Sequence, residues 1–89
     1  MKEKLVAPSL LACDFTRIKE QTDTLAAAGC KILHLDVMDG VFVKNISFGQ
    51  PVVASVRKAS PLILDTHLMI TDPIRYVDSF SAAGADIIT

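Results

Sequence analysis

Two apolar segments of the sequence carry polar side chains at alternate positions. In the first segment, His34 and Asp36 alternate with apolar residues at positions 33, 35 and 37. Successive side chains of a β-strand point to opposite faces, so one face is apolar and the other carries the imidazole and the carboxylate. Residues two apart on a strand have Cα atoms about 6.5–7 Å apart and point the same way. The polar face therefore meets either water or a chemical site.

The second segment repeats this alternation around His67. One face would carry Ile63, Asp65, His67 and Met69, and the other Leu62, Leu64, Thr66 and Leu68. Adjacent strands lie about 4.8 Å apart, which brings His67 within reach of His34 and Asp36. Two imidazoles and a carboxylate suit a divalent ion, and three protein ligands with an open position are typical of catalytic sites. The convergence of these residues favours a metal site over three separate surface residues.

Other polar residues in and around these segments have ordinary structural interpretations. Asp39, which precedes a glycine, fits a turn, and Asp14 and Asp72 fit helix N-caps. In a barrel, Asp65 fits a structural ion-pair partner in the interior. Ser9 follows a proline and fits either a turn or an inward-facing strand position.

The elements that must position these side chains follow a repeating order of strand and helix. We expect strands over 5–11, 32–37, 62–69 and 86–89, with helices over 15–28, 51–58 and 73–83. Strand starts about 30 residues apart are typical of βαβ units, which build a parallel sheet. In the third helix, Ile74, Val77 and Phe80 should face inward.

Two architectures fit this order, a doubly wound open sheet and a (β/α)8 barrel. The glycine motif of dinucleotide-binding folds does not follow the first expected strand, so such a fold has no support. In a barrel, inward side chains near the carboxyl ends of the strands form the active site. A hairpin through Asp39 and Gly40, with a strand at 41–43, is the local alternative.

Composition and charge exclude several classes of protein. The chain has 89 residues, 51% of them hydrophobic, and a net charge of −1, so we expect one small folded domain without a nucleic-acid or membrane surface. The two cysteines, Cys13 and Cys30, fit buried thiols in a reducing cytosol. Because the sequence ends inside an expected strand, we expect it to be a fragment of a longer protein.

Four sequence strings, in order along almost the whole chain, resemble the ribulose-phosphate 3-epimerase family. They are APSLLACDF (7–15), HLDVMDGVFVKNISFG (34–49), LDTHLMI (64–70) and AGADIIT (83–89). The resemblance implies a (β/α)8 TIM barrel. Residues 1–89 would be the N-terminal part of that single domain, comprising the first three βα units and the start of strand four.

The resemblance also implies a reaction and roles for individual residues. The reaction interconverts D-ribulose 5-phosphate and D-xylulose 5-phosphate by removing and returning the C3 proton through an enediolate, in the pentose phosphate pathway. Asp36 matches one of two catalytic aspartates, and His34, Asp36 and His67 match three of four metal ligands. The positions that match substrate-binding residues are Ser9, His67, Met38 and Met69. Taken without the resemblance, the two methionines fit core fillers.

The implied cofactor is one divalent ion, Zn, Fe, Mn or Co, and the implied partner is a phosphorylated pentulose. A cytoplasmic homo-oligomer is expected. Val41 and Lys44 depart from the family's pattern, in which proline is expected at position 44, so allulose 6-phosphate 3-epimerase remains an alternative. A related phosphosugar binder or aldolase-like barrel, which would not need His34 as a ligand, is another.

The family's second catalytic aspartate belongs to a later strand, and a barrel's phosphate site usually follows strands seven and eight. We therefore expect the 89-residue chain alone to be inactive. The alternative hypothesis, in which the chain is not an enzyme, is a non-catalytic half-barrel that self-associates through exposed strand edges.

Overall fold

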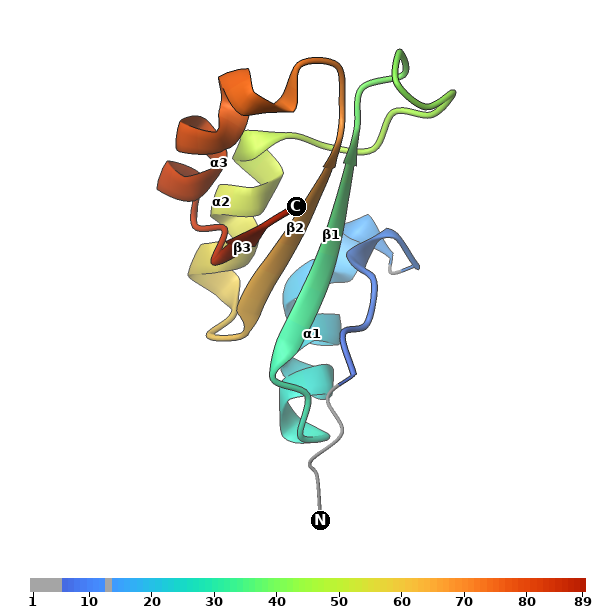
Figure 1. Cartoon of the computed structure of the whole chain (residues 1–89). Helices are drawn as coiled ribbons and strands as arrows, with labels where there is room; N and C mark the ends of the chain where they lie inside the picture. The colour runs from blue at the N-terminus through green and yellow to red at the C-terminus, as the bar shows by residue number, and fades with distance from the viewer. Residues whose placement is uncertain (1–5, 13) are drawn as a thin grey trace.

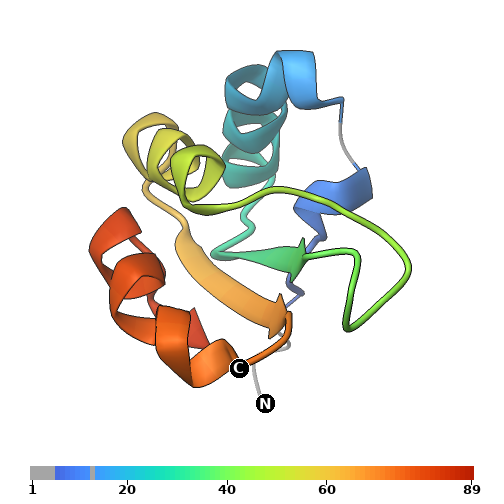
Figure 2. The ribbon, with the colours of Figure 1, turned by 90° about the horizontal axis from the view of Figure 1, so that it is seen from above.

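A computed structural model describes residues 6–12 and 14–89 of the chain. Three parallel strands form one sheet in the order β1-β2-β3, and three α-helices lie in an arc along one face of it (Figures 1 and 2). The strands are β1 (Ile32–Met38), β2 (Ile63–Met69) and β3 (Ile87–Ile88). The helices are α1 (Ile18–Ala27), α2 (Gln50–Ala59) and α3 (Val77–Ala83), with 3-10 turns η1 (Leu10–Ala12), η2 (Phe15–Arg17) and η3 (Pro73–Tyr76). This order confirms the predicted parallel βα arrangement.

The core lies between the sheet and the helices, as the alternation predicts. Leu33, Leu35 and Val37 of β1 are buried, and Leu64 and Leu68 of β2 lie on the same helix-facing side. Each fully buried side chain of this kind stabilises the fold by about 1.5–3 kcal/mol. The opposite face of both strands is only partly buried, and it carries the histidines and aspartates.

The register of β1 and β2 makes polar residues of the two strands direct neighbours. His34 pairs with Asp65, and Asp36 pairs with His67. The parallel pairing shows that the hairpin alternative is wrong, because the residues after β1 do not form a second strand against it. Only an isolated antiparallel bridge, Asp39 with Ile46, forms inside the loop between β1 and α2.

The strand expected over residues 5–11 is wrong for the part that the structure describes. Leu5 lies outside the described residues. Ser9 forms an isolated parallel bridge with His34, and the Pro8 carbonyl accepts a hydrogen bond from the His34 N–H at 2.9 Å. The chain then turns into η1. Proline has no N–H to donate, so the ladder does not extend through Pro8.

The N-cap predicted at Asp14 is confirmed. The Asp14 side chain accepts the Thr16 N–H at 3.0 Å and caps η2, which leads into α1. At the other end, Gly29 has φ of +96°, the left-handed conformation that commonly follows a helix. The helix therefore begins one turn later than predicted, because its first turn is 3-10.

The expected start of the third helix is wrong in two respects. Asp72 has φ of +54° and its side chain makes no capping hydrogen bond. Ile74 is 85% exposed and Val77 is also exposed, whereas Phe80 is buried as predicted. The first turn, η3, which carries Ile74, lies beyond the carboxyl ends of β1 and β2 (Figure 1). Tyr76 packs against the core there instead.

Within residues 6–12 and 14–89, we find no helix with the length and apolar character that crossing a membrane requires.

Candidate metal centre

The structure brings His34, Asp36 and His67 together on the face of the sheet away from the helices. One possible ligand atom from each residue lies within 4.8 Å of the others. The distance from His34 Nε2 to Asp36 Oδ1 is 2.8 Å, and from His67 Nδ1 to the same oxygen 3.4 Å. Because two neighbouring parallel strands fix the backbone of all three residues, the group is rigidly positioned.

A fourth side chain, Asp65, holds the other nitrogen of His34. Asp65 Oδ2 lies 3.1 Å from His34 Nδ1, so the imidazole sits between two carboxylates. Burial lowers the pKa of His34, but the hydrogen bonds and negative charges of Asp65 and Asp36 together raise it above its ordinary value. With Nδ1–H donated to Asp65, Nε2 is left as the nitrogen that faces Asp36 and His67.

The donor set fits a divalent transition metal. Two imidazole nitrogens and one carboxylate oxygen are the ligands that zinc and its neighbours take in catalytic sites. Asp65 supplies the hydrogen bond that ligating histidines almost always make through their second nitrogen. The three side chains are partly exposed, which leaves room for a further ligand.

The three other predicted site residues lie near this group in different ways. Ser9 is bridged to His34 through the backbone, and its hydroxyl accepts the Leu11 N–H at 3.2 Å, as the turn interpretation expects. Met38 and Met69 are register partners at the ends of β1 and β2. Each follows a candidate ligand by two residues, so the methionine side chains project from the same face as the ligands.

Ser47 is a structural residue of the site that sequence reasoning missed. Its hydroxyl donates to the Asp36 carbonyl at 2.6 Å and accepts the Met38 N–H at 2.9 Å. The loop after β1 thereby returns to the backbone of a candidate ligand. No local pattern could have indicated this contact, because it joins residues eleven apart through an irregular loop.

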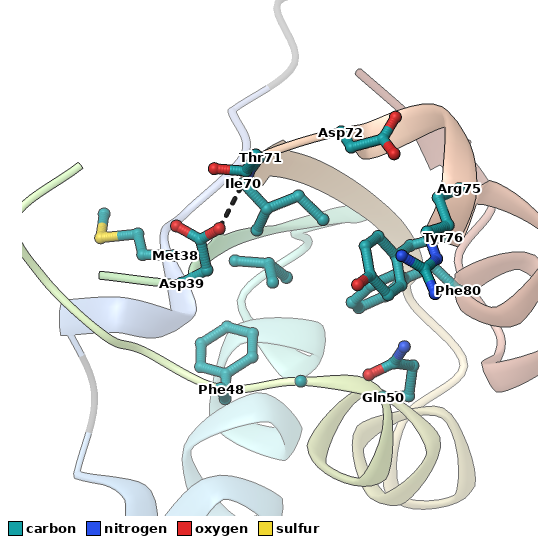
Figure 3. Close-up of a pocket in the computed structure, with 12 residues that line it drawn as sticks. Met38, Asp39, Phe48, Gln50, Ile70, Thr71, Asp72, Arg75, Tyr76 and Phe80 are labelled. Carbon is teal, nitrogen blue, oxygen red and sulfur yellow. Dashed lines mark hydrogen bonds between the residues drawn. The ribbon is translucent and has the colours of Figure 1, made fainter. Parts of the chain in front are cut away.

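A cavity of about 500 Å³ opens at the same edge of the sheet, between the loop after β1, the start of α2 and η3 (Figure 3). Its lining includes the apolar side chains of Val37, Phe48, Ile70 and Phe80 on the helix-covered side of the sheet, and also Arg75. The candidate metal ligands point from the opposite face of the sheet, so this cavity is not part of the metal centre.

Repeated parallel βα units with titratable side chains late in the strands are the arrangement of α/β barrel enzymes. Comparison with known proteins narrows this class. The model of the ribulose-phosphate 3 epimerase family matches residues 5–89. The chain belongs to the ribulose-phosphate 3-epimerase family, and its sheet is part of the TIM barrel of that family.

Three relatives illustrate the similarity, each named as a ribulose-phosphate or ribulose-5-phosphate 3-epimerase. The protein from Synechocystis sp. is 47% identical over 88 residues, which cover 99% of this chain and 38% of the relative. The Bacillus subtilis protein is 45% identical, covering 94% of this chain and 39% of the relative. The chloroplastic Arabidopsis thaliana protein is 46% identical, covering 96% and 30%. The chain thus spans two fifths or less of the length of these relatives.

Proposed function

We propose that this chain is the N-terminal part of a ribulose-phosphate 3-epimerase, with residues 1–89 forming the first three βα units and the start of the fourth strand of one barrel domain. The substrates are D-ribulose 5-phosphate and D-xylulose 5-phosphate. The observation that carries the proposal is the meeting of His34, Asp36 and His67 at one point, in a chain of this family.

Asp36 is the proposed acid–base residue. Inversion at C3 requires one group to remove a proton beside the carbonyl and a second group to return a proton to the other face. A positioned carboxylate contributes about 10²–10⁴-fold to such a proton transfer. The Ser47 hydroxyl holds the Asp36 carbonyl, so the backbone that carries this carboxylate is fixed. The second acid–base group would come from a later strand of the barrel.

His34, Asp36 and His67 are the proposed ligands of one divalent ion, and Zn, Fe, Mn and Co all accept these donors. When bound, the ion supplies positive charge that stabilises the negative charge developing on the substrate oxygens. Asp65 orients the His34 ring for this role.

Ser9, His67, Met38 and Met69 are the proposed substrate-binding residues. The hydroxyl and imidazole can hydrogen-bond substrate oxygens, and the two methionines can exclude water beside the reacting carbon. We also propose a homo-oligomer and a cytoplasmic location. One similar protein, from Oryza sativa subsp. japonica, is a cytoplasmic isoform.

A hybrid enzyme tests this function. The chain replaces the aligned segment of the Bacillus subtilis relative, and a coupled assay measures conversion of D-ribulose 5-phosphate. We expect turnover, at least a 100-fold loss in Asp36→Asn, and joint loss of turnover and bound metal in His34→Ala. Asp78→Asn, the same charge change at an exposed position of α3, should leave both unchanged.

Two results would contradict the proposal. Full turnover in His34→Ala would favour the other alternative, a related phosphosugar-binding or aldolase-like barrel that does not need His34 as a metal ligand. Faster conversion of allulose 6-phosphate than of ribulose 5-phosphate would assign the chain to the alternative substrate.

A further inference from the structure

One carboxylate joins the two loops that follow β1 and β2. Asp39, the first residue after β1, accepts the Val41 and Phe42 N–H groups on Oδ1, each at 2.9 Å. Its Oδ2 accepts the Thr71 N–H at 2.8 Å (Figure 3). Thr71 lies 32 residues further along the chain, in the loop after β2. The turn predicted at Asp39 is present, and the same side chain also reaches the neighbouring loop.

This link is strong for a partly exposed residue. Hydrogen bonds to an ionised carboxylate are about twice as strong as neutral ones. The three N–H groups, with that of Thr71 first, hold the pKa of Asp39 at about 2, so the carboxylate stays ionised throughout the neutral range. Both oxygens of Asp39 therefore have defined backbone partners.

The loop around Asp39 is shaped to present its N–H groups to that carboxylate. Gly40 has φ of +79°, and a Cβ at this position would lie 2.8 Å from Ile46 Cγ1. Only glycine fits this turn without a shift of its neighbour. At the far end of the loop, Ser47 is bonded to the backbone of Asp36 and Met38. The loop is thus fixed at both ends.

We propose that Asp39 is a positioning residue that holds the loops after β1 and β2 in the arrangement that binds the sugar phosphate. This inference rests on the proposed function. The linked loops begin next to Met38 and Met69, which are proposed to contact substrate. The candidate metal ligands lie within the strands, whose ladder fixes them independently of Asp39. Loss of the link should therefore weaken substrate binding while leaving metal binding intact.

The link itself is tested by amide hydrogen exchange on the full chain, by NMR. In Asp39→Ala, we expect the Val41, Phe42 and Thr71 amides to exchange at least tenfold faster. In Asp39→Asn, one oxygen becomes an NH₂ group that cannot accept, so the Thr71 amide should be released while the turn amides stay protected. Asp72→Asn is the matched control, since it removes the same charge from the neighbouring loop, where Asp72 makes no capping bond.

Protection of the Leu35 and Leu64 amides, in the middle of β1 and β2, reports whether each variant folds. Unchanged Thr71 exchange in Asp39→Ala, or an unprotected Thr71 amide in the wild-type chain, would overturn the proposal. Loss of protection at Leu35 and Leu64 in both Asp39 variants would also overturn it, because Asp39 would then act on overall stability.

Kinetics of the hybrid enzyme test the consequence for substrate. We expect Asp39→Asn to raise KM about tenfold, with kcat and Co²⁺ affinity each within threefold of wild type. A parallel loss of Co²⁺ affinity would overturn the positioning role. A wild-type hybrid without turnover would overturn the proposed function and this role in substrate binding, while the exchange data on the chain would separately decide whether the loops are linked.

Discussion

At the scale of single residues, Asp65 is proposed to fix which nitrogen of His34 is available to bind a metal. Its carboxylate lies 3.1 Å from His34 Nδ1 and comes from the register partner on β2. Losing such a partner typically lowers metal affinity 10–100-fold. We predict this loss for Asp65→Ala in a Co²⁺ titration followed by absorbance. Asp65→Asn keeps an acceptor and should lose less, and equal affinity in all three proteins would contradict the role.

The raised pKa of His34 predicts opposite pH trends for stability and metal binding. The imidazolium between Asp36 and Asp65 stabilises the fold fully below the unfolded pKa of about 6.5, and this stability is lost as pH rises through the higher folded pKa. Urea unfolding in chelator should therefore show stability falling above pH 6.5. Co²⁺ affinity should rise over the same range, because the proton competes for Nε2.

His34→Gln is the control for both trends. It should flatten the stability trend above pH 6.5 and reduce the gain in metal affinity, because His67 is the one imidazole that remains in the ligand set. A stability that rises with pH in the wild-type chain would contradict the assigned sign.

The candidate ligands could be predicted from the sequence because strand alternation is a local rule. His34, Asp36 and His67 follow from period two and from the spacing of neighbouring strands. The hydrogen bonds of Ser47 to β1 and of Asp39 to Thr71 could not be predicted. They depend on the conformations of irregular loops, for which the sequence has no periodic pattern.

At the scale of elements, Arg57 of α2 links the segment before β2 to the segment before β3. This link lies at the end of the sheet opposite to the loops that follow β1 and β2. The Arg57 guanidinium donates to the Ser60 and Leu62 carbonyls, to the Gly84 carbonyl and to Asp86. Four acceptors in different directions require the planar fork of arginine. Arg57→Lys should therefore destabilise the fold by about 1–2 kcal/mol in urea unfolding, without changing Co²⁺ affinity. Wild-type stability in this variant would contradict the assignment.

The elements with strong hydrophobic periodicity lie where the sequence predicts them. The described residues before η1 and the start of the third helix do not, because periodicity carries no information about backbone donors or about where the sheet ends. β1, β2 and α2 lie where alternation and helical spacing indicate. Residues 6–9, the described part of the segment before η1, do not form a strand, because Pro8 has no N–H to donate. The i, i+3 spacing of Ile74 and Val77 suggested a buried stripe, but both side chains are exposed. Spacing alone does not show that the first turn, η3, lies beyond the ends of the strands (Figure 1).

At the scale of the whole molecule, the face that carries the histidines points away from the helices (Figure 2). On the strands, Ile63 and Ile87 are 42% and 45% exposed. Strand edges and exposed apolar side chains favour association. We predict that the chain alone has no epimerase turnover and elutes above its 9.6 kDa monomer mass in size exclusion with light scattering. A 9.6 kDa monomer with turnover would contradict both parts.

Metal ligation by His34, Asp36 and His67 is the claim on which the proposed chemistry depends. The most direct test is anomalous diffraction at the zinc edge from crystals of the chain grown with Zn²⁺. We predict one strong peak that contacts all three side chains and vanishes in His67→Ala. A peak bound elsewhere, with these three side chains free of metal, would contradict the account.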